Sequence, residues 1–195
     1  MSKADILAID PSDQMSAVLD SCVLFPMYLR DTLLRVASAG LYRPYWSQEI
    51  LNGAIRNLIG QKRMTVEKAN NLETKIKQAF PEAMVTIGNQ LIDQMTNHPD
   101  DRHVLATAVV AKAEVIVTEN LKHFPASELE YWNVKAISSD SFLCSLYFLD
   151  SERIVQVIQR QASVLKKPPL TVEQLLDLLR REVPEFAEKV SSSLL

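Results

Sequence analysis

The chain has 195 residues, of which 47% are hydrophobic and 23% are charged, as in ordinary soluble globular proteins. Its formal net charge of −3 excludes binding to nucleic acid through overall basicity, so any such contact needs a local basic patch or a bound cation. Cys22 and Cys144 lack metal-ligand spacing, no leader sequence opens the chain and no apolar run is long enough for a membrane span. We therefore expect reduced thiols, a cytoplasmic location and no membrane partner.

The first half of the chain predicts one buried strand followed by three helices. Residues 17–19 form an apolar run without polar alternation, which is typical of a strand buried on both faces of a parallel sheet. Pro26 suits the first turn of a helix, and Gly40 suits the position just after its end. Ser47 and Thr65 are good N-cap residues for the two helices that we expect next.

The second half continues the alternation of strands and helices up to residue 137. We predict strands at residues 84–87, 114–118 and 134–137, and a helix over 100–112 that immediately precedes the second of these strands. Short apolar strands that alternate with helices indicate an α/β fold with a mainly parallel sheet.

After Ser138 the pattern becomes helical throughout. Pro168 and Pro169 interrupt the helices, and the pair Thr171 and Gln174 has the spacing of a capping box. We therefore predict a domain over residues 15–137 and a C-terminal helical extension over 138–195.

Three polar residues are placed where strands end, and a fourth opens a helix. Asp20 follows the first strand, Thr118 and Asn120 end a later one, and Asp101 opens the helix that precedes it. Ligands of open parallel sheets bind beyond the carboxyl ends of the strands, so we expect Asp20, Asp101 and Asn120 to face one crevice. A structural alternative stays open for Asp101, because acids at helix starts commonly cap backbone N–H groups. Asp20 is harder to explain structurally, since a carboxylate beside a buried strand is costly unless it is paired or metal-bound.

The clustered acids favour a particular chemistry. Carboxylates placed close together repel one another unless a cation lies between them. Carboxylate, amide and water oxygens suit Mg²⁺ or Mn²⁺, and such an ion activates water and stabilises the transition state of phosphodiester hydrolysis. The pattern therefore predicts a metal-dependent nuclease.

Four segments together resemble the PIN domain family, in particular a VapC-like subgroup with a C-terminal extension: "AVLDSCVLFP", "WSQEILNGAIRNLI", "DDRHVLATA" and "VIVTENLKHFP". The resemblance implies a three-layer α/β/α sandwich and an Mg²⁺- or Mn²⁺-dependent ribonuclease, often a toxin held by an antitoxin protein. By position it assigns the family's acids to Asp20 and Asp101, and its Thr-x-Asp/Asn element to Thr118 and Asn120. RNA is the implied substrate.

Two positions depart from the family pattern. Gly53 stands where the family usually has a Glu ligand, and His123 stands where the subgroup often has Asp. Glu49 lies four residues before Gly53 on the same helical face and is our candidate replacement. Glu119 is a second spare acid, but as the neighbour of Asn120 on a strand it should point to the opposite face. We expect reduced metal affinity.

Three further interpretations compete with an active ribonuclease. The first is a catalytically impaired PIN-like module that binds RNA or protein. The second, a phosphotransferase of the haloacid-dehalogenase type, requires D-x-D where the chain has Asp20-Ser21-Cys22. The third is a zinc site, but the spacing of His98 and His103 matches no zinc motif, so we expect these histidines to cap helices or face solvent. The apolar faces of the tail helices need a partner, which is this chain, a second copy in a homodimer, or an antitoxin.

Overall fold

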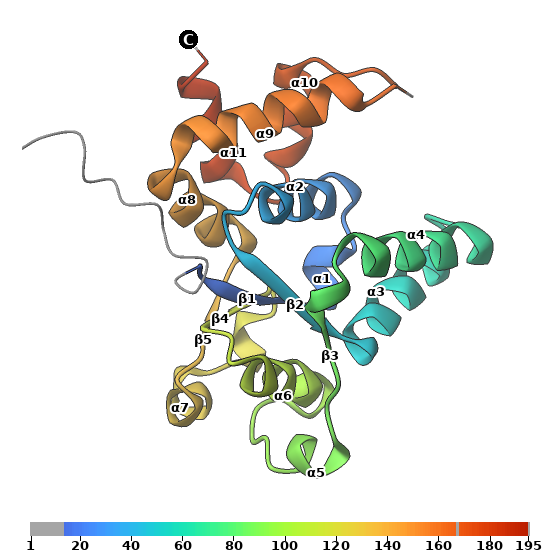
Figure 1. Cartoon of the computed structure of the whole chain (residues 1–195), viewed down its shortest axis with the longest axis vertical. Coiled ribbons are helices and arrows are strands. Elements are labelled where there is room, and N and C mark those ends of the chain that lie inside the picture. Colours follow the sequence, from blue (N-terminus) through green and yellow to red (C-terminus); the bar gives the residue numbers. More distant parts are fainter. Residues whose placement is uncertain (1–13, 167, 195) are drawn as a thin grey trace, which may run out of the picture.

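A computed structural model describes residues 14–166 and 168–194 of the chain. Its centre is a sheet of five parallel strands in the order β3-β2-β1-β4-β5 (Figure 1). The strands are β1 (Ser16–Leu19), β2 (Arg43–Ser47), β3 (Met84–Val85), β4 (Val115–Val117) and β5 (Lys135–Ile137).

The central strand β1 has the burial that its sequence predicts. Ala17, Val18 and Leu19 are completely buried, and β1 pairs with β2 on one side and β4 on the other. Helices cover both faces of the sheet, so neither face of β1 meets water and no polar alternation is required.

Helices on the two faces complete three layers, which confirms the predicted fold. α6 (Arg102–Ala111) packs against β1, β2 and β4, while α2 (Met27–Ser38) and the C-terminal helices lie on the other side of the sheet (Figure 1). α3 (Gln48–Gly60) and α4 (Val66–Ala79) pack on each other as a pair. The short helices are α1 (Ser21–Leu24), α5 (Asn89–Ile92) and α7 (Ala126–Leu129).

The predicted helix starts at Ser47 and Thr65 are confirmed, because each side chain accepts a hydrogen bond from the first turn of its helix. Strand β2 was not predicted, since Pro44 in "RPYWS" suggests a loop. Pro44 is tolerated because β3 pairs only with Trp46 and Ser47, so β2 has no second neighbour at Pro44 that would need its missing N–H group.

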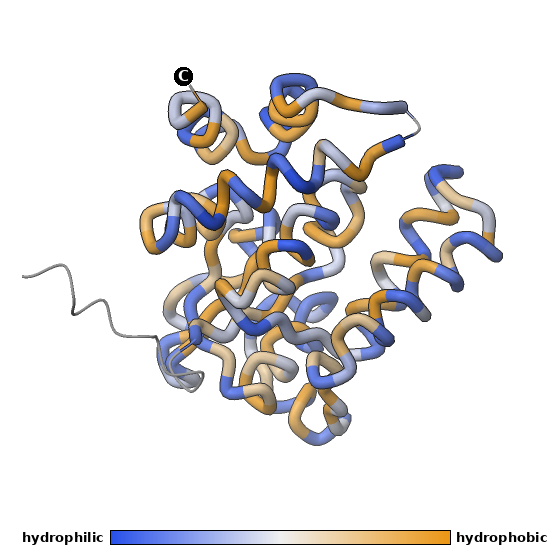
Figure 2. The backbone as a smooth tube through the Cα atoms, turned by 45° about the horizontal axis from the view of Figure 1, so that its top comes forward, coloured by the Kyte–Doolittle hydropathy of each residue, from blue (hydrophilic) through white to orange (hydrophobic). Residues whose placement is uncertain are grey.

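The C-terminal extension packs on the sheet domain through α2. Apolar and polar residues alternate along its helices, as expected for helices with one buried face (Figure 2). At the contact, the buried Thr32 hydroxyl of α2 donates to Gln161 Oε1 at 2.8 Å, and Gln161 Nε2 donates to the Tyr28 carbonyl at 3.3 Å. The extension comprises α8 (Ser139–Leu149), α9 (Ser151–Val164), α10 (Val172–Leu179) and α11 (Pro184–Ser192).

The extension is also tied together internally. Asp140 in the first turn of α8 accepts hydrogen bonds from the backbone N–H groups of Glu185 and Phe186 at the start of α11. The capping box of Thr171 and Gln174 is present at the start of α10. The division into residues 15–137 and 138–195 stays a prediction. Over residues 14–166 and 168–194, no helix combines the length and apolar character needed to cross a bilayer.

Candidate metal centre

Asp20 lies at the carboxyl end of β1, where it is 1% exposed and forms the N-cap of α1. One carboxylate oxygen accepts the Ser21 N–H at 2.5 Å. The other accepts the Thr118 hydroxyl at 2.7 Å and the Cys22 thiol at 3.2 Å. All three donors are neutral. Since a carboxylate offers about four lone-pair sites, about one remains for a further ligand.

Thr118 holds this arrangement together from the end of β4. It is completely buried, and its oxygen accepts the backbone N–H of Asn120 at 3.0 Å while its hydroxyl donates to Asp20. The Asp20 backbone N–H donates to the Val117 carbonyl, which fixes the ends of β1 and β4 side by side. We name Asp20, Thr118 and Asn120 the Asp20 group. Thr118 acts in it by positioning Asp20.

Cys22 contributes a proton donor to the Asp20 group. Burial raises the pKa of its thiol to about 12, and the negative charge of Asp20 adds to the effect. The thiol therefore stays protonated at neutral pH, which suits a donor to a carboxylate and makes Cys22 an unreactive nucleophile. Neither Cys22 nor Cys144 forms a disulfide in the part of the chain that the structure describes.

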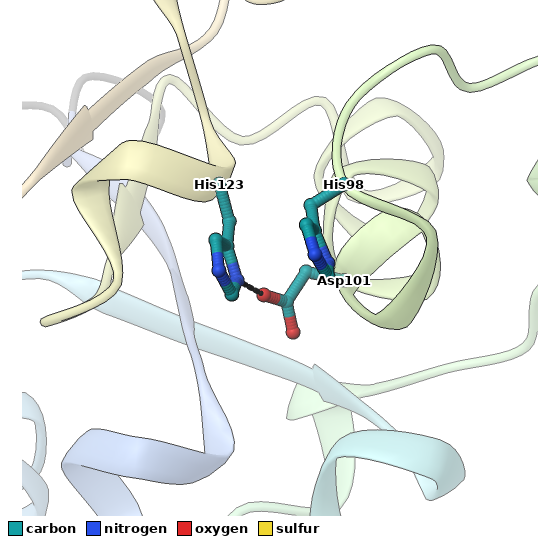
Figure 3. A group of neighbouring side chains, drawn as sticks. All are labelled: His98, Asp101 and His123. Atoms are coloured by element: carbon teal, nitrogen blue, oxygen red, sulfur yellow. Dashed lines mark hydrogen bonds and ion pairs between the residues drawn. The ribbon is translucent and has the colours of Figure 1, made fainter.

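Asp101 has a different set of neighbours. It ends the short 3-10 helix η3 (Pro99–Asp101), and its carboxylate lies 2.6 Å from His123 Nδ1 (Figure 3). Asp101 occupies the N-cap position of α6, but its side chain makes no capping hydrogen bond there, so that part of the structural alternative is wrong. The His98 ring stacks on the His123 ring with centroids 3.9 Å apart and planes 9° apart. We name His98, Asp101 and His123 the His98 group.

The His98 group joins two segments that are distant in sequence. His98 and Asp101 come from the segment before α6, and His123 ends the 3-10 helix η4 (Leu121–His123) that follows β4 (Figure 3). The backbone N–H of His98 donates to the His123 carbonyl at 3.3 Å. His98 Nδ1 also accepts the Asp100 N–H at 3.4 Å, so the expected capping role is present. Its place beside Asp101 and His123 was missed.

The two groups are separated by one short helix. Asn120 occupies the N-cap position of η4, and the His123 N–H donates to the Asn120 carbonyl at 2.8 Å. Within residues 14–166 and 168–194, no hydrogen bond joins Asp20 directly to Asp101. Hydrogen bonds thus connect Asp20 with Thr118, and Asp101 with His123. A shared metal ion between Asp20 and Asp101 stays a prediction.

The other predicted acids lie around this edge of the sheet. Glu49 is exposed in the first turn of α3, where a carboxylate also complements the helix dipole. Glu119 accepts hydrogen bonds from the backbone N–H and hydroxyl of Ser139. Its carboxylate is therefore held at the start of α8 and is not a spare ligand.

Gly53 has a packing role that the sequence did not reveal. A Cβ atom at this position would lie 3.1 Å from Ser21 Cβ and 3.3 Å from Ser21 Oγ, which is closer than ordinary van der Waals contact. The glycine therefore lets α3 approach α1 immediately after Asp20. A glutamate at position 53 would need α1 or Ser21 to shift by a few tenths of an ångström.

A cavity of about 580 Å³ opens beside the Asp20 group, between the start of α2, the end of α3 and the turn from α10 to α11. Cys22 and Glu119 lie on its wall, and the exposed guanidinium groups of Arg63 and Arg181 are at its margin. Much of the remaining wall is apolar and includes Phe25, Leu29, Met64 and Leu178.

The available donor atoms determine which ions fit. Asp20 retains one free lone-pair site and Asp101 retains an oxygen that is not bonded to His123, so oxygen ligands for Mg²⁺ or Mn²⁺ are present. Asn120 adds a partly exposed side-chain amide to these donors. The imidazoles beside Asp101 are less suited to Mg²⁺.

Comparison with known proteins supplies independent information. The PIN domain family matches residues 16–122, and the family described as VapC50 C-terminal domain matches residues 139–192. A protein of Mycobacterium tuberculosis named "Putative ribonuclease VapC50" is 48% identical over 101 residues, which are 52% of this chain and 60% of that protein. The chain thus matches less than two thirds of the length of this relative. None of the solved structures matches the chain.

Proposed function

The chain belongs to the PIN domain family, and from this premise we propose that it is a metal-dependent ribonuclease that hydrolyses RNA phosphodiester bonds. The observation that carries the proposal is the environment of Asp20. Its carboxylate is buried at the carboxyl edge of a parallel sheet and receives hydrogen bonds only from neutral donors among the described residues. A buried charge without a counterion costs several kcal/mol, so this arrangement favours a bound cation.

The residues that would hold the cation are Asp20 and Asp101, with the Asn120 amide as a further oxygen ligand. A bound Mg²⁺ or Mn²⁺ supplies positive charge for the phosphodiester transition state and lowers the pKa of bound water. Thr118 keeps the Asp20 carboxylate in one orientation through its hydroxyl. Glu49, exposed at the start of α3, is the candidate to orient or deprotonate the attacking water.

We place the RNA strand at the cavity beside the Asp20 group, whose lining also contains the acids Glu119 and Glu182. Arg63 and Arg181 are exposed at its margin and offer guanidinium donors for phosphate oxygens. The net charge of −3 makes such a local pair necessary, because the protein as a whole does not attract polyanions. The name of the mycobacterial relative supports RNA as the substrate.

The wider biological role follows the family resemblance. We expect the chain to act in the cytoplasm as a toxin whose partner is an antitoxin protein, and a homodimer is a further expected assembly. Co-purification of the chain with the product of a neighbouring gene, checked by mass spectrometry, tests the antitoxin partner.

The direct test is RNA cleavage with and without metal. The purified chain should cleave RNA in Mn²⁺ or Mg²⁺ and not in EDTA, and Asp20→Asn should lower the rate roughly 100-fold or more because a charged ligand is lost. Asp93→Asn is the matched control, since Asp93 is exposed at the end of α5 and belongs to neither group. RNA that stays intact in both metals would refute the enzyme.

A second candidate is the impaired PIN-like module that binds RNA or protein without cleaving RNA. Two observations favour it: Gly53 replaces the family's usual glutamate, and one Asp101 oxygen is bonded to His123. This module should bind RNA in EDTA as tightly as in Mn²⁺, measured by fluorescence anisotropy. A cleaved product in Mn²⁺ would exclude it.

A further inference from the structure

The His98 group has the composition of a transition-metal site. We propose that His98, Asp101 and His123 bind a borderline divalent transition-metal ion, with Zn²⁺ as the representative, through two imidazole nitrogens and one carboxylate oxygen. This site differs from the oxygen-rich site of the proposed nuclease, with which it shares only Asp101. Binding at the His98 group does not depend on nuclease activity.

The geometry is close to what such an ion needs. One candidate ligand atom from each residue lies within 4.8 Å of the other two, and the His123 Nδ1 to Asp101 oxygen distance is 2.6 Å. Zn²⁺ binds nitrogen and oxygen at about 2.0–2.2 Å, which places tetrahedral ligand atoms roughly 3.4 Å apart. Binding therefore needs shifts of about an ångström and a rotation of the stacked imidazole rings, because each ring nitrogen binds a metal in the plane of its ring. The backbone hydrogen bond between His98 and His123 keeps the two segments together during this rearrangement.

The donor set also selects the type of ion. Imidazole suits Zn²⁺, Ni²⁺, Cu²⁺ and Fe²⁺, whereas Mg²⁺ requires near-octahedral oxygen ligands and releases water reluctantly. Three protein ligands leave a fourth tetrahedral position for water or another small ligand. The His98 side chain is 42% exposed, so an ion reaches the site from solvent without opening of the fold.

Asn97 provides a second observation in the same loop. It directly precedes His98, is 2% exposed, and neither atom of its side-chain amide has a hydrogen-bond partner among the described residues. Native proteins rarely leave a buried amide unpaired. The loop that carries His98 therefore holds a buried polar group whose partner the described residues do not supply.

The test measures metal binding to the untagged full chain by calorimetry after removal of bound metal. Zn²⁺ should bind with one site per chain, and His98→Ala or His123→Ala should weaken it about tenfold or more. His103→Ala is the matched control and should leave Zn²⁺ affinity unchanged, because His103 is the third histidine and lies outside the group. Co²⁺ should give a visible absorption spectrum that the His98 variant loses.

Two outcomes would overturn the proposal. One is unchanged Zn²⁺ affinity in the half-exposed His98→Ala variant, whose fold is checked by its melting temperature without metal. The other is loss of Zn²⁺ binding in Asp20→Asn, which would place the ion at the Asp20 group. Failure of RNA cleavage does not affect either result, so the two proposals are tested separately.

Discussion

The Asp20 group and the His98 group lie near the same edge of one sheet, yet their carboxylates have different neighbours. The Asp20 carboxylate is buried and receives only neutral hydroxyl, thiol and backbone donors. The Asp101 carboxylate is 14% exposed and lies beside two stacked imidazoles. Its immediate neighbour is thus an imidazole nitrogen and not a hydroxyl, thiol or backbone N–H group.

The difference shows how one substitution in a family pattern changes a whole site. His123 stands where the related subgroup often has an acid, and it bonds to the acid that the family pattern assigns to the metal. His98 then stacks on His123 and adds a second nitrogen donor. An acid that the family pattern groups with other oxygen donors thereby lies beside two imidazoles instead.

The largest expected effect is that of Asp101→Asn, because Asp101 is the only residue assigned to both sites. We expect RNA cleavage to fall roughly 100-fold or more, as for loss of an electrostatic group in an active site. Zn²⁺ affinity should fall about tenfold or more. Asp20→Asn should lower cleavage alone, and His98→Ala should lower Zn²⁺ affinity alone.

Calorimetry with Zn²⁺ and gel-based RNA cleavage on these three variants measure both effects. If Asp101→Asn retains either activity at the wild-type level, Asp101 is not shared and the two groups are independent.

The next largest effect is that of Thr118→Val, which tests the Asp20 group alone. The change keeps the shape of the side chain but removes a donor to Asp20 and an acceptor for the Asn120 N–H. Leaving such buried groups unpaired should lower the free energy of unfolding by about 1–3 kcal/mol. Urea denaturation measures this loss, and RNA cleavage should fall about tenfold as Asp20 loses its fixed orientation.

Thr107→Val is the control for Thr118→Val. Thr107 is equally buried, but its hydroxyl donates only to the His103 carbonyl within the same helix. If Thr107→Val lowers the free energy of unfolding as much as Thr118→Val does, the hydrogen bond from Thr118 to Asp20 contributes no more than an ordinary buried hydroxyl.

The sequence predicts the Asp20 group better than the His98 group, for a physical reason. Asp20, Thr118 and Asn120 follow apolar strands, and the rule that parallel strands end at one edge places such residues near each other. His98 and His123 come from two loops whose approach depends on the short helices η3 and η4. No periodic pattern in the sequence predicts that these two loops lie close together.

Strand β2 and helix α1 were missed for related reasons. Pro44 makes the sequence of β2 look like a loop. The four residues of α1 are too few to show helical periodicity. The reason for a glycine at position 53 was therefore hidden, because it lies in the contact of α3 with Ser21 on α1.

A smaller effect is expected from restoring the family's acid at position 53. Gly53→Glu adds a carboxylate near the Asp20 group and should raise Mn²⁺ affinity a few-fold, limited by the 3.1 Å contact with Ser21. Combining it with Ser21→Gly removes that contact and should raise the affinity further. Gly53→Ala is the control, because it adds a Cβ atom without a carboxylate. Alanine favours the helix by about 1 kcal/mol relative to glycine, and the contact with Ser21 opposes this gain.

Calorimetry with Mn²⁺ on the single and double variants measures the affinities. Equal Mn²⁺ affinity in wild type, Gly53→Glu and the double variant would mean that position 53 does not face the metal site.

The smallest effect concerns the protonated thiol of Cys22, which donates to Asp20. Because its folded pKa of about 12 exceeds the ordinary value of 9.0, the thiol favours folding fully below pH 9, and this contribution is lost as pH rises toward 12. At pH 8 iodoacetamide should therefore modify Cys22 about tenfold or more slowly in the native chain than in urea, as followed by peptide mass spectrometry. Cys144, whose pKa burial raises to about 11, should also be slow and provides an internal reference. Rapid modification of Cys22 alone would show that its thiol is not held protonated beside Asp20. The set of neutral donors that distinguishes the Asp20 group from the His98 group would then be incomplete, and the main argument for a cation at Asp20 would lose one of its three supports.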